Sequence, residues 1–122
     1  MGAEREGLLG LVICRAGEHR FAFPASAIVQ ISDWALGQSP APHARAAYAL
    51  PPIAGRCVED GSGGLVVDSL EVATDPLPVL PVPAMLLGAV GGALRGFIVL
   101  AGELCPVLAI TEFAQYLSRS SA

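Results

Sequence analysis

The ten residues GGLVVDSLEV, from Gly63 to Val72, constrain the fold of this chain more than any other segment. A glycine pair precedes three apolar residues, and Asp68 interrupts the run before apolar and polar residues begin to alternate. β-branched residues at this density favour a strand over a helix. A carboxylate directly after three apolar residues can accept hydrogen bonds from a turning backbone. We therefore expect a buried strand, a kink at Asp68 and a second strand on the next sheet edge.

The rest of the chain predicts further short strands joined by glycine-containing turns. Strands are expected at 8–15, 19–23, 55–59, 97–100 and 103–110, and a short extended piece with Val29, Ile31 and Trp34 follows one possible helical turn at 25–30. Pro106 lies inside a predicted strand, which indicates an edge position or a bulge. The proline-spaced residues 74–83 predict extended irregular structure, either a packed crossover or a polyproline ligand. Residues 35–53 are rich in Ala and Pro and predict a loop.

The pattern changes to a 3.6-residue period at Thr111. Thr111 is a suitable N-cap, Glu112 falls in the first turn, and Phe113, Tyr116 and Leu117 share one face. This predicts a short C-terminal helix over about 111–118 that packs on the strands. The fold class expected from all these elements is mostly β.

Composition excludes several classes of function. A chain of 122 residues predicts one domain, 1–122, and 53% apolar against 15% charged residues is too apolar for disorder. Some apolar surface is therefore expected to face partners. No apolar run approaches the roughly 20 residues of a membrane span, and the N-terminus lacks the shape of a signal peptide, so we expect no membrane insertion. Seven scattered basic residues and a net charge of −4 argue against nucleic-acid binding.

Chemistry-bearing residues are few and isolated. Cys14, Cys57 and Cys105 form no C-x-x-C pair, which argues against a disulfide framework or a zinc site and favours a reducing cytoplasm. We interpret them as small core or edge residues. His19 and His43 lie beside no cysteine or carboxylate cluster and are interpreted as exposed imidazoles. We expect no catalytic, cofactor or metal site.

Three segments together resemble the CheW-like domains, the coupling modules of bacterial chemotaxis systems. CRAGEHRFAFPASAIVQI resembles the family's opening hairpin and its V-x-E-I motif, and GGLVVDSLEV resembles the hairpin that ends in VVD. GFIVLAGELCPVLAITEFAQYL is similar to the closing strands and helix. The resemblance covers roughly 8–34 and 54–117. It implies paired small, SH3-like β-barrels with a short C-terminal helix.

The chain departs from the family in its middle. The family's N-L-R-G segment should lie near 35–53 and is missing, so the resemblance implies that this stretch is a shortened loop and that the first barrel is reduced. The acidic residue of V-x-E-I is Gln30 here, and its arginine partner is missing as well. An unpaired carboxylate would be costly, so the joint loss is physically consistent. The chain resembles the shortened CheW homologues of gliding bacteria, the FrzB type.

The resemblance implies a non-enzymatic cytoplasmic adaptor without a cofactor. It would bind the cytoplasmic tip of a chemoreceptor and link it to a CheA-like histidine kinase. One wall of its apolar groove would hold Ile28, Val29, Gln30 and Ile31, whereas Val67 and Leu100 would belong to the other wall or to the core behind it. The alternative is an accessory scaffold that has lost kinase binding and contacts receptor, another CheW-like protein or a second copy of itself.

Overall fold

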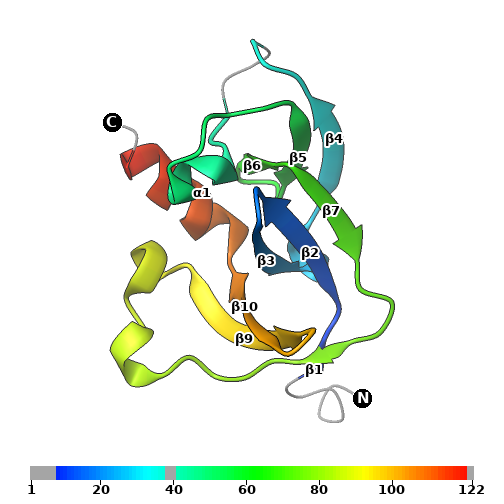
Figure 1. The fold of residues 1–122 in the computed structure, drawn as a ribbon, viewed down its shortest axis with the longest axis vertical. Coiled ribbons are helices and arrows are strands. Elements are labelled where there is room, and N and C mark those ends of the chain that lie inside the picture. Colours follow the sequence, from blue (N-terminus) through cyan, green and yellow to red (C-terminus); the bar gives the residue numbers. More distant parts are fainter. Residues whose placement is uncertain (1–7, 38–40, 121–122) are drawn as a thin grey trace.

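The computed structural model describes residues 8–37 and 41–120 (Figure 1). Within these residues the chain forms short strands, several 3-10 turns and a C-terminal α helix, which confirms the mostly β class. The strands and the helix are β1 (Leu8–Leu9), β2 (Leu11–Ala16), β3 (His19–Pro24), β4 (Gln30–Trp34), β5 (Gly55–Glu59), β6 (Gly64–Val67), β7 (Ser69–Val72), β8 (Leu77–Pro78), β9 (Leu94–Leu100), β10 (Glu103–Leu108) and α1 (Ile110–Ser120).

The strands form three sheets. The largest has the order β7-β2-β3-β10-β9, the second has the order β4-β5-β6, and β1 pairs with β8. Hairpins join β2 to β3, β5 to β6 and β9 to β10, as their turn residues predicted. Gly17 adopts a φ of 64° in the first of these turns, a conformation that glycine reaches without a Cβ clash.

Residues 63–72 connect the two larger sheets. β6 pairs with β5 in the three-stranded sheet, and β7 pairs with β2 in the five-stranded sheet. Asp68 lies between them and accepts a hydrogen bond from the backbone N–H of Gly17 at 2.8 Å. The predicted strand, kink and second strand are therefore confirmed.

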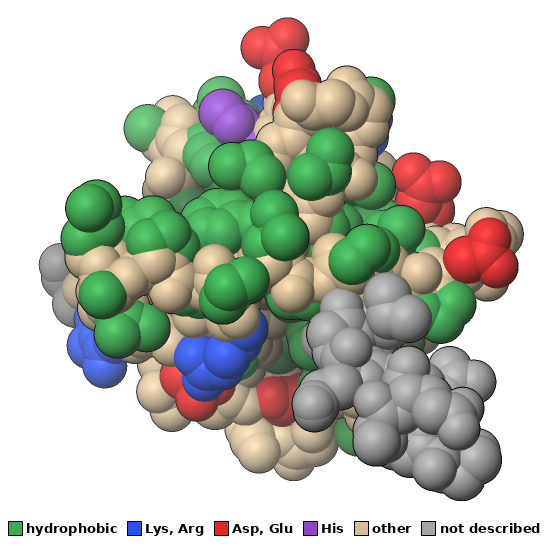
Figure 2. Space-filling model, turned by 90° about the horizontal axis from the view of Figure 1, so that it is seen from below, with side chains coloured by type: hydrophobic (Ala, Val, Ile, Leu, Met, Phe, Trp, Pro, Cys, Tyr) green, Lys and Arg blue, Asp and Glu red, His purple; other side chains and the backbone are tan. Residues whose placement is uncertain are grey.

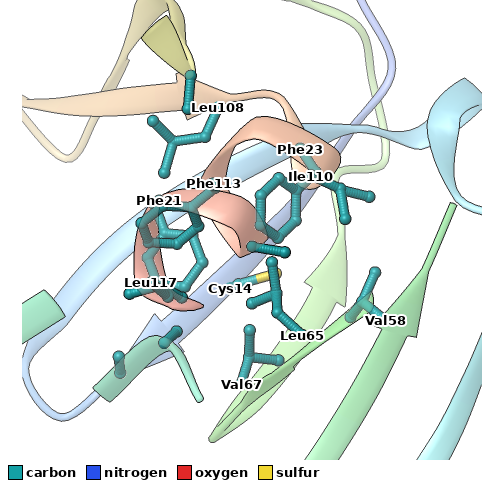
Figure 3. Close-up of a cluster of buried hydrophobic side chains, with 14 of the residues drawn as sticks. Cys14, Phe21, Phe23, Val58, Leu65, Val67, Leu108, Ile110, Phe113 and Leu117 are labelled. Atoms are coloured by element: carbon teal, nitrogen blue, oxygen red, sulfur yellow. The ribbon is translucent and has the colours of Figure 1, made fainter. Parts of the chain in front are cut away.

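The main core lies between the sheets and α1. Phe21, Phe23 and Phe113 have ring centroids 5.5–6.4 Å apart, with edge-to-face or tilted planes. Leu65 and Leu117 point toward these rings (Figure 3), and all five side chains are at most 1% exposed. A second cluster on the other side of the five-stranded sheet comprises Leu11, Ile13, Ala22, Ile98, Cys105 and Val107. Helix α1 thus covers the sheets with the face that its periodicity predicted.

Helix α1 begins one residue before the predicted N-cap. The N–H of Phe113 already donates to the carbonyl of Ala109, and the helix starts at Ile110. Thr111 is therefore inside the first turn and is not the N-cap. Its hydroxyl hydrogen-bonds to the carboxylate of Asp60, which ties the helix to the β5–β6 turn.

The expected closed barrels are wrong: both larger sheets are open. β7 and β9 are the edges of one sheet, and β4 and β6 are the edges of the other. Residues 35–37 and 41–54 supply no strand that could close the smaller sheet, apart from an isolated bridge between His43 and Val66. Within residues 8–37 and 41–120 two of these edges are covered only by isolated bridges, His43–Val66 at β6 and Leu80–Phe97 at β9, so neither sheet closes.

The stretch 35–53 contains a 3-10 helix, Ala44–Tyr48, in the part that the structure describes; residues 38–40 lie outside it. His43 precedes this helix and is 7% exposed, so the expectation of an exposed imidazole is wrong. Its Nε2 lies 2.8 Å from the Ile53 carbonyl, and the ring packs edge-on against Trp34. Tertiary hydrogen bonds thus bury a histidine that stands alone in sequence. His19 is exposed, as expected, and stacks on Tyr48.

Residues 74–83 form a packed crossover. β8 pairs with β1, and Leu80 exchanges two backbone hydrogen bonds with Phe97 on the outer edge of β9. The contact is close because Gly96 has no Cβ: a methyl group there would lie 2.5 Å from Val79 Cγ1. Pro106 lies in β10, which is an inner strand by order, one residue before a register shift. The bulge alternative for Pro106 therefore describes β10 better than the edge alternative.

Candidate partner-binding surface

The predicted wall 28–31 lies where the chain passes from one sheet to the other. β3 ends at Pro24, a 3-10 turn follows, and the N–H of Val29 donates to the carbonyl of Glu59 at 2.8 Å. This hydrogen bond holds the start of β4 against the end of β5. β4 has β5 as its strand neighbour on one side, and its other side is an edge of the sheet.

The exposure of the four wall residues differs. Val29 is 72% exposed and Gln30 is exposed, whereas Ile28 and Ile31 are half-buried. Ile28 packs against the main core, so its side chain contributes to the stability of the fold and only part of it is accessible to a partner. Gln30 lies opposite Glu59 in the β4–β5 register. The surface available to a partner here is small, apolar and centred on Val29.

The structure does not bring Val67 and Leu100 to this wall. Val67 is fully buried in the main core, where a partner cannot reach its side chain (Figure 3). Leu100 is half-buried against the second core cluster. It lines a hollow of about 330 Å³ with Ile13, Val72 and Leu77, at the far end of the five-stranded sheet from β4. The core alternative therefore describes Val67, and Leu100 lies in a separate hollow.

A larger hollow lies between α1 and the three-stranded sheet. It has a volume of about 620 Å³, and its lining includes Trp34, Cys57, Glu59, Gln115 and Arg119. Ser32 and Cys57 are paired across β4 and β5, so their side chains face the hollow together. Sequence reasoning missed this hollow. The sequence shows which side chains share a face of β4 and β5 and which form the polar face of α1. It does not show that these two faces lie opposite each other in the fold.

A largely buried ion pair lies at the junction between the sheets. Arg45 Nη1 lies 2.6 Å from Asp68 Oδ2, and both side chains are about 15% exposed. Arg45 also donates from Nε to the carbonyl of Pro51 at 2.6 Å. The same Asp68 oxygen accepts from Gly17, so one carboxylate joins the first hairpin, the 3-10 helix and the corner between β6 and β7. The arrangement positions the strands and contains no nucleophile.

Burial and hydrogen bonding shift the pKa of a few side chains. Burial raises the pKa of the Cys14 thiol to about 12 and that of Cys105 to about 11, so both thiols stay protonated at neutral pH. Partial burial raises the pKa of Asp60, but hydrogen bonds from Thr111, Ser62 and Gly63 outweigh it and leave the pKa below its ordinary value. No group of three or more metal-ligating side chains occurs within 8–37 and 41–120.

No helix in the described part of the chain is both long and apolar enough to span a bilayer.

The fold is similar to that of the scaffolding protein CheW from Thermoanaerobacter tengcongensis. The TM-score is 0.54 with 12% sequence identity, over 83% of this chain and 88% of that chain. No protein-family model and no curated protein sequence matches the chain. At this identity the likeness concerns the fold and not the activity. The narrower likeness to the FrzB type stays a prediction. The chain therefore has a CheW-like fold, as its three motifs predicted.

Proposed function

We propose that this protein is a non-catalytic adaptor of a chemosensory system in the cytoplasm. It binds the helical tip of a chemoreceptor with the surface formed by Ile28, Val29, Gln30 and Ile31 and links the receptor to a histidine-kinase array. The observation that carries this proposal is the CheW-like fold, a scaffolding fold in the matched protein. Val67 and Leu100 are left out of the binding surface because one is buried and the other lies in a separate hollow.

The exposure of Val29 supports the position of the surface. A valine that is 72% exposed beside two half-buried isoleucines gives an apolar ridge that a partner helix can cover. The ridge is anchored by the Val29–Glu59 backbone hydrogen bond, so little backbone ordering is needed on binding. The chain contains no charge at 28–31, which suits an apolar helix face.

An accessory role is the second candidate. The described residues of 35–53 contribute a 3-10 helix where the family's middle segment would lie, and the three-stranded sheet stays open. In the family the middle segment would help to build one of the surfaces that contact a partner protein. Without that segment this surface would be incomplete, and we expect kinase binding to be the interaction that is lost. In that role the protein would bind receptor or another CheW-like protein and regulate array assembly.

Separate titrations distinguish the two candidates. The receptor tip and the kinase regulatory domain are each added to the full chain in a calorimeter. Receptor binding with kinase binding at micromolar strength or tighter, about −8 kcal/mol, supports the coupling role. Receptor binding without kinase binding supports the accessory role. Absence of receptor binding overturns the coupling role, and absence of binding to a second CheW-like protein as well overturns the accessory role.

A further inference from the structure

One long stretch of the chain carries no polar side chain, and much of it lies at the surface. Every residue from Pro76 to Leu94 is Pro, Leu, Val, Ala, Met or Gly. Several of its large side chains face outward: Leu80 is 46% exposed, Met85 is 89% exposed and Leu87 is 62% exposed. The adaptor surface at 28–31 uses none of them.

The register of β9 and β10 extends this apolar stretch onto the sheet. Leu80 is paired with Phe97, and Phe97 is paired with Pro106, so their side chains point to the same side. Val99 and Leu104 are the next pair on that side and are 55% and 64% exposed. Two exposed apolar side chains directly opposite each other are unusual on a solvated strand pair.

These residues form what we name the apolar face: Leu80, Met85, Leu86, Leu87, Val99 and Leu104. Figure 2 shows a band of hydrophobic side chains that crosses the molecule on the side where residues 77–87 run. The six side chains together expose on the order of 600 Å², the upper end for the largest apolar patch of a monomer. With the exposed Pro81, Pro83 and Ala84 the area approaches the roughly 800 Å² per partner of a standard interface.

The two ends of the apolar face carry opposite net charge, although each end also holds an ion pair within the chain: Arg95 with Glu112 at 3.0 Å and Glu103 with Arg20 at 3.3 Å. Arg95 directly follows the apolar stretch, and the guanidinium of Arg119, which also lines the larger hollow, lies near Gly91 of the stretch. Asp75 directly precedes the stretch, and Glu103 lies at the tip of the β9–β10 hairpin beside Leu104. In Figure 2 basic side chains border the band at the lower left with acidic side chains beside them, and further acidic side chains lie at the right and at the top.

We propose that the apolar face is a self-association surface on which a second copy of this chain packs in the opposite direction about a two-fold axis. The two-fold axis places the arginine end of one copy on the carboxylate end of the other, and the apolar residues meet in the centre. The lack of polar groups favours a second copy, because homodimer interfaces are more apolar than those of transient partners. This surface is distinct from the wall at 28–31, so in the dimer the wall of each copy stays free. The proposal does not depend on receptor binding.

The first test is the mass of the full chain in solution. Sedimentation equilibrium from about 1 to about 200 µM covers the range of a standard-size interface without strong anchors. We expect a monomer–dimer equilibrium in this range. A monomer throughout the range overturns the proposal, and so does an open-ended series of larger species, because a two-fold interface closes on itself.

Variants then locate the interface. Met85→Glu and Leu104→Glu each place a carboxylate in the centre of the apolar face at an exposed position, where folding tolerates it. We expect each to weaken dimerisation at least tenfold, while Val29→Glu, an exposed valine outside the face, leaves it unchanged. Asp75→Arg alone should weaken the dimer about threefold or more, and adding Arg119→Glu should restore it. Dimerisation that Met85→Glu and Leu104→Glu leave unaltered assigns it to another surface and overturns the proposal.

Discussion

Among single residues, Asp68 joins segments that lie far apart in the chain. Its Oδ2 accepts from the N–H of Gly17, 51 positions away, and from the guanidinium of Arg45, 23 positions away. A carboxylate can satisfy both donors because it offers several lone-pair directions. Asp68, which directly follows β6, therefore links the first hairpin and the 3-10 helix at the corner between the two sheets.

Replacing this carboxylate should be costly. Asp68→Asn leaves the largely buried Arg45 without a counter-charge, so we expect a loss of about 2–4 kcal/mol of unfolding free energy. Urea denaturation measures the loss. The matched control is Asp33→Asn, which removes the exposed carboxylate of the Arg56 pair and should change stability by less than about 0.5 kcal/mol. Equal effects of the two variants would show that burial adds nothing to the Arg45–Asp68 pair.

Asp60 should make stability depend on pH. Its pKa is lower in the folded chain than its ordinary value of 3.8, so its contribution to stability is complete above that value. The contribution is lost as the pH falls through the lower, folded pKa. Asp60→Asn removes the ionised carboxylate and with it this contribution. We therefore expect wild type to melt above the variant at pH 7 and the gap to shrink toward pH 2.5. A gap that stays constant over this range would contradict the role of the ionised carboxylate.

Val29 tests the proposed receptor surface. Val29→Glu puts a charge where a partner helix would bury apolar surface, so receptor-tip affinity should fall by at least about 2 kcal/mol. Thermal stability should change little because the side chain is 72% exposed. Ile28→Glu should lower stability as well, since Ile28 packs on the core. Val72→Glu, a similarly exposed valine on β7, serves as the control. Unchanged affinity in a folded Val29→Glu protein would remove this surface from the proposal.

At the scale of elements, two connecting segments cover strand edges, which their sequences only partly predicted. The crossover from β7 to β9 covers the outer edge of β9 through the Leu80–Phe97 hydrogen bonds. The 3-10 helix Ala44–Tyr48 packs beside β6 and carries the arginine of the buried pair. Each protects part of a sheet edge that the open topology leaves exposed.

The crossover passes very close to the backbone of β9 at Gly96. Gly96→Ala would place a methyl group 2.5 Å from Val79 Cγ1 and 2.7 Å from the Leu80 carbonyl, so the crossover must move. We expect a loss of about 1–3 kcal/mol and faster hydrogen exchange at the N–H of Leu80. Gly88→Ala, where a Cβ meets nothing within 4 Å, should be within about 0.5 kcal/mol of wild type. An unchanged exchange rate at Leu80 would show that the crossover does not depend on this contact.

For the whole molecule, α1 closes the core that both larger sheets share. Phe113 meets Phe21 and Phe23 of the five-stranded sheet, and the helix also packs on β6 of the smaller sheet. An adaptor with two partner surfaces benefits from such a shared core, because the surfaces keep a constant relative position.

The shared core predicts a single cooperative unfolding transition. Phe113→Ala should cost about 3–5 kcal/mol and lower the midpoints of both sheets together, when Cys57 labelling and far-ultraviolet circular dichroism are followed in urea. Gln115→Ala, on the exposed side of α1, should leave both midpoints in place. Separate transitions for the two probes would mean that the sheets unfold independently.

The sequence alone determined most of the strands, the positions of the tight turns and the buried face of α1, but it did not predict β8 or the start of β9 at Leu94. These features follow from side-chain periodicity and turn chemistry, which act over a few neighbouring residues. The kink at Asp68 between β6 and β7, the glycine-containing turn between β5 and β6 and the buried Phe113 and Leu117 were predictable for this reason. The three motifs likewise predicted the CheW-like fold.

Only the tertiary structure decided whether the sheets close, what Arg45 and His43 contact and which surfaces stay open. Closure depends on whether an edge strand finds another extended segment, and no local pattern records that. His43 is buried against Trp34 and the Ile53 carbonyl. Val67 lies in the core and not on the predicted wall. Such outcomes rest on tertiary contacts between residues that are not neighbours in the chain, where the gain from packing must exceed the entropy of closing the loop between them.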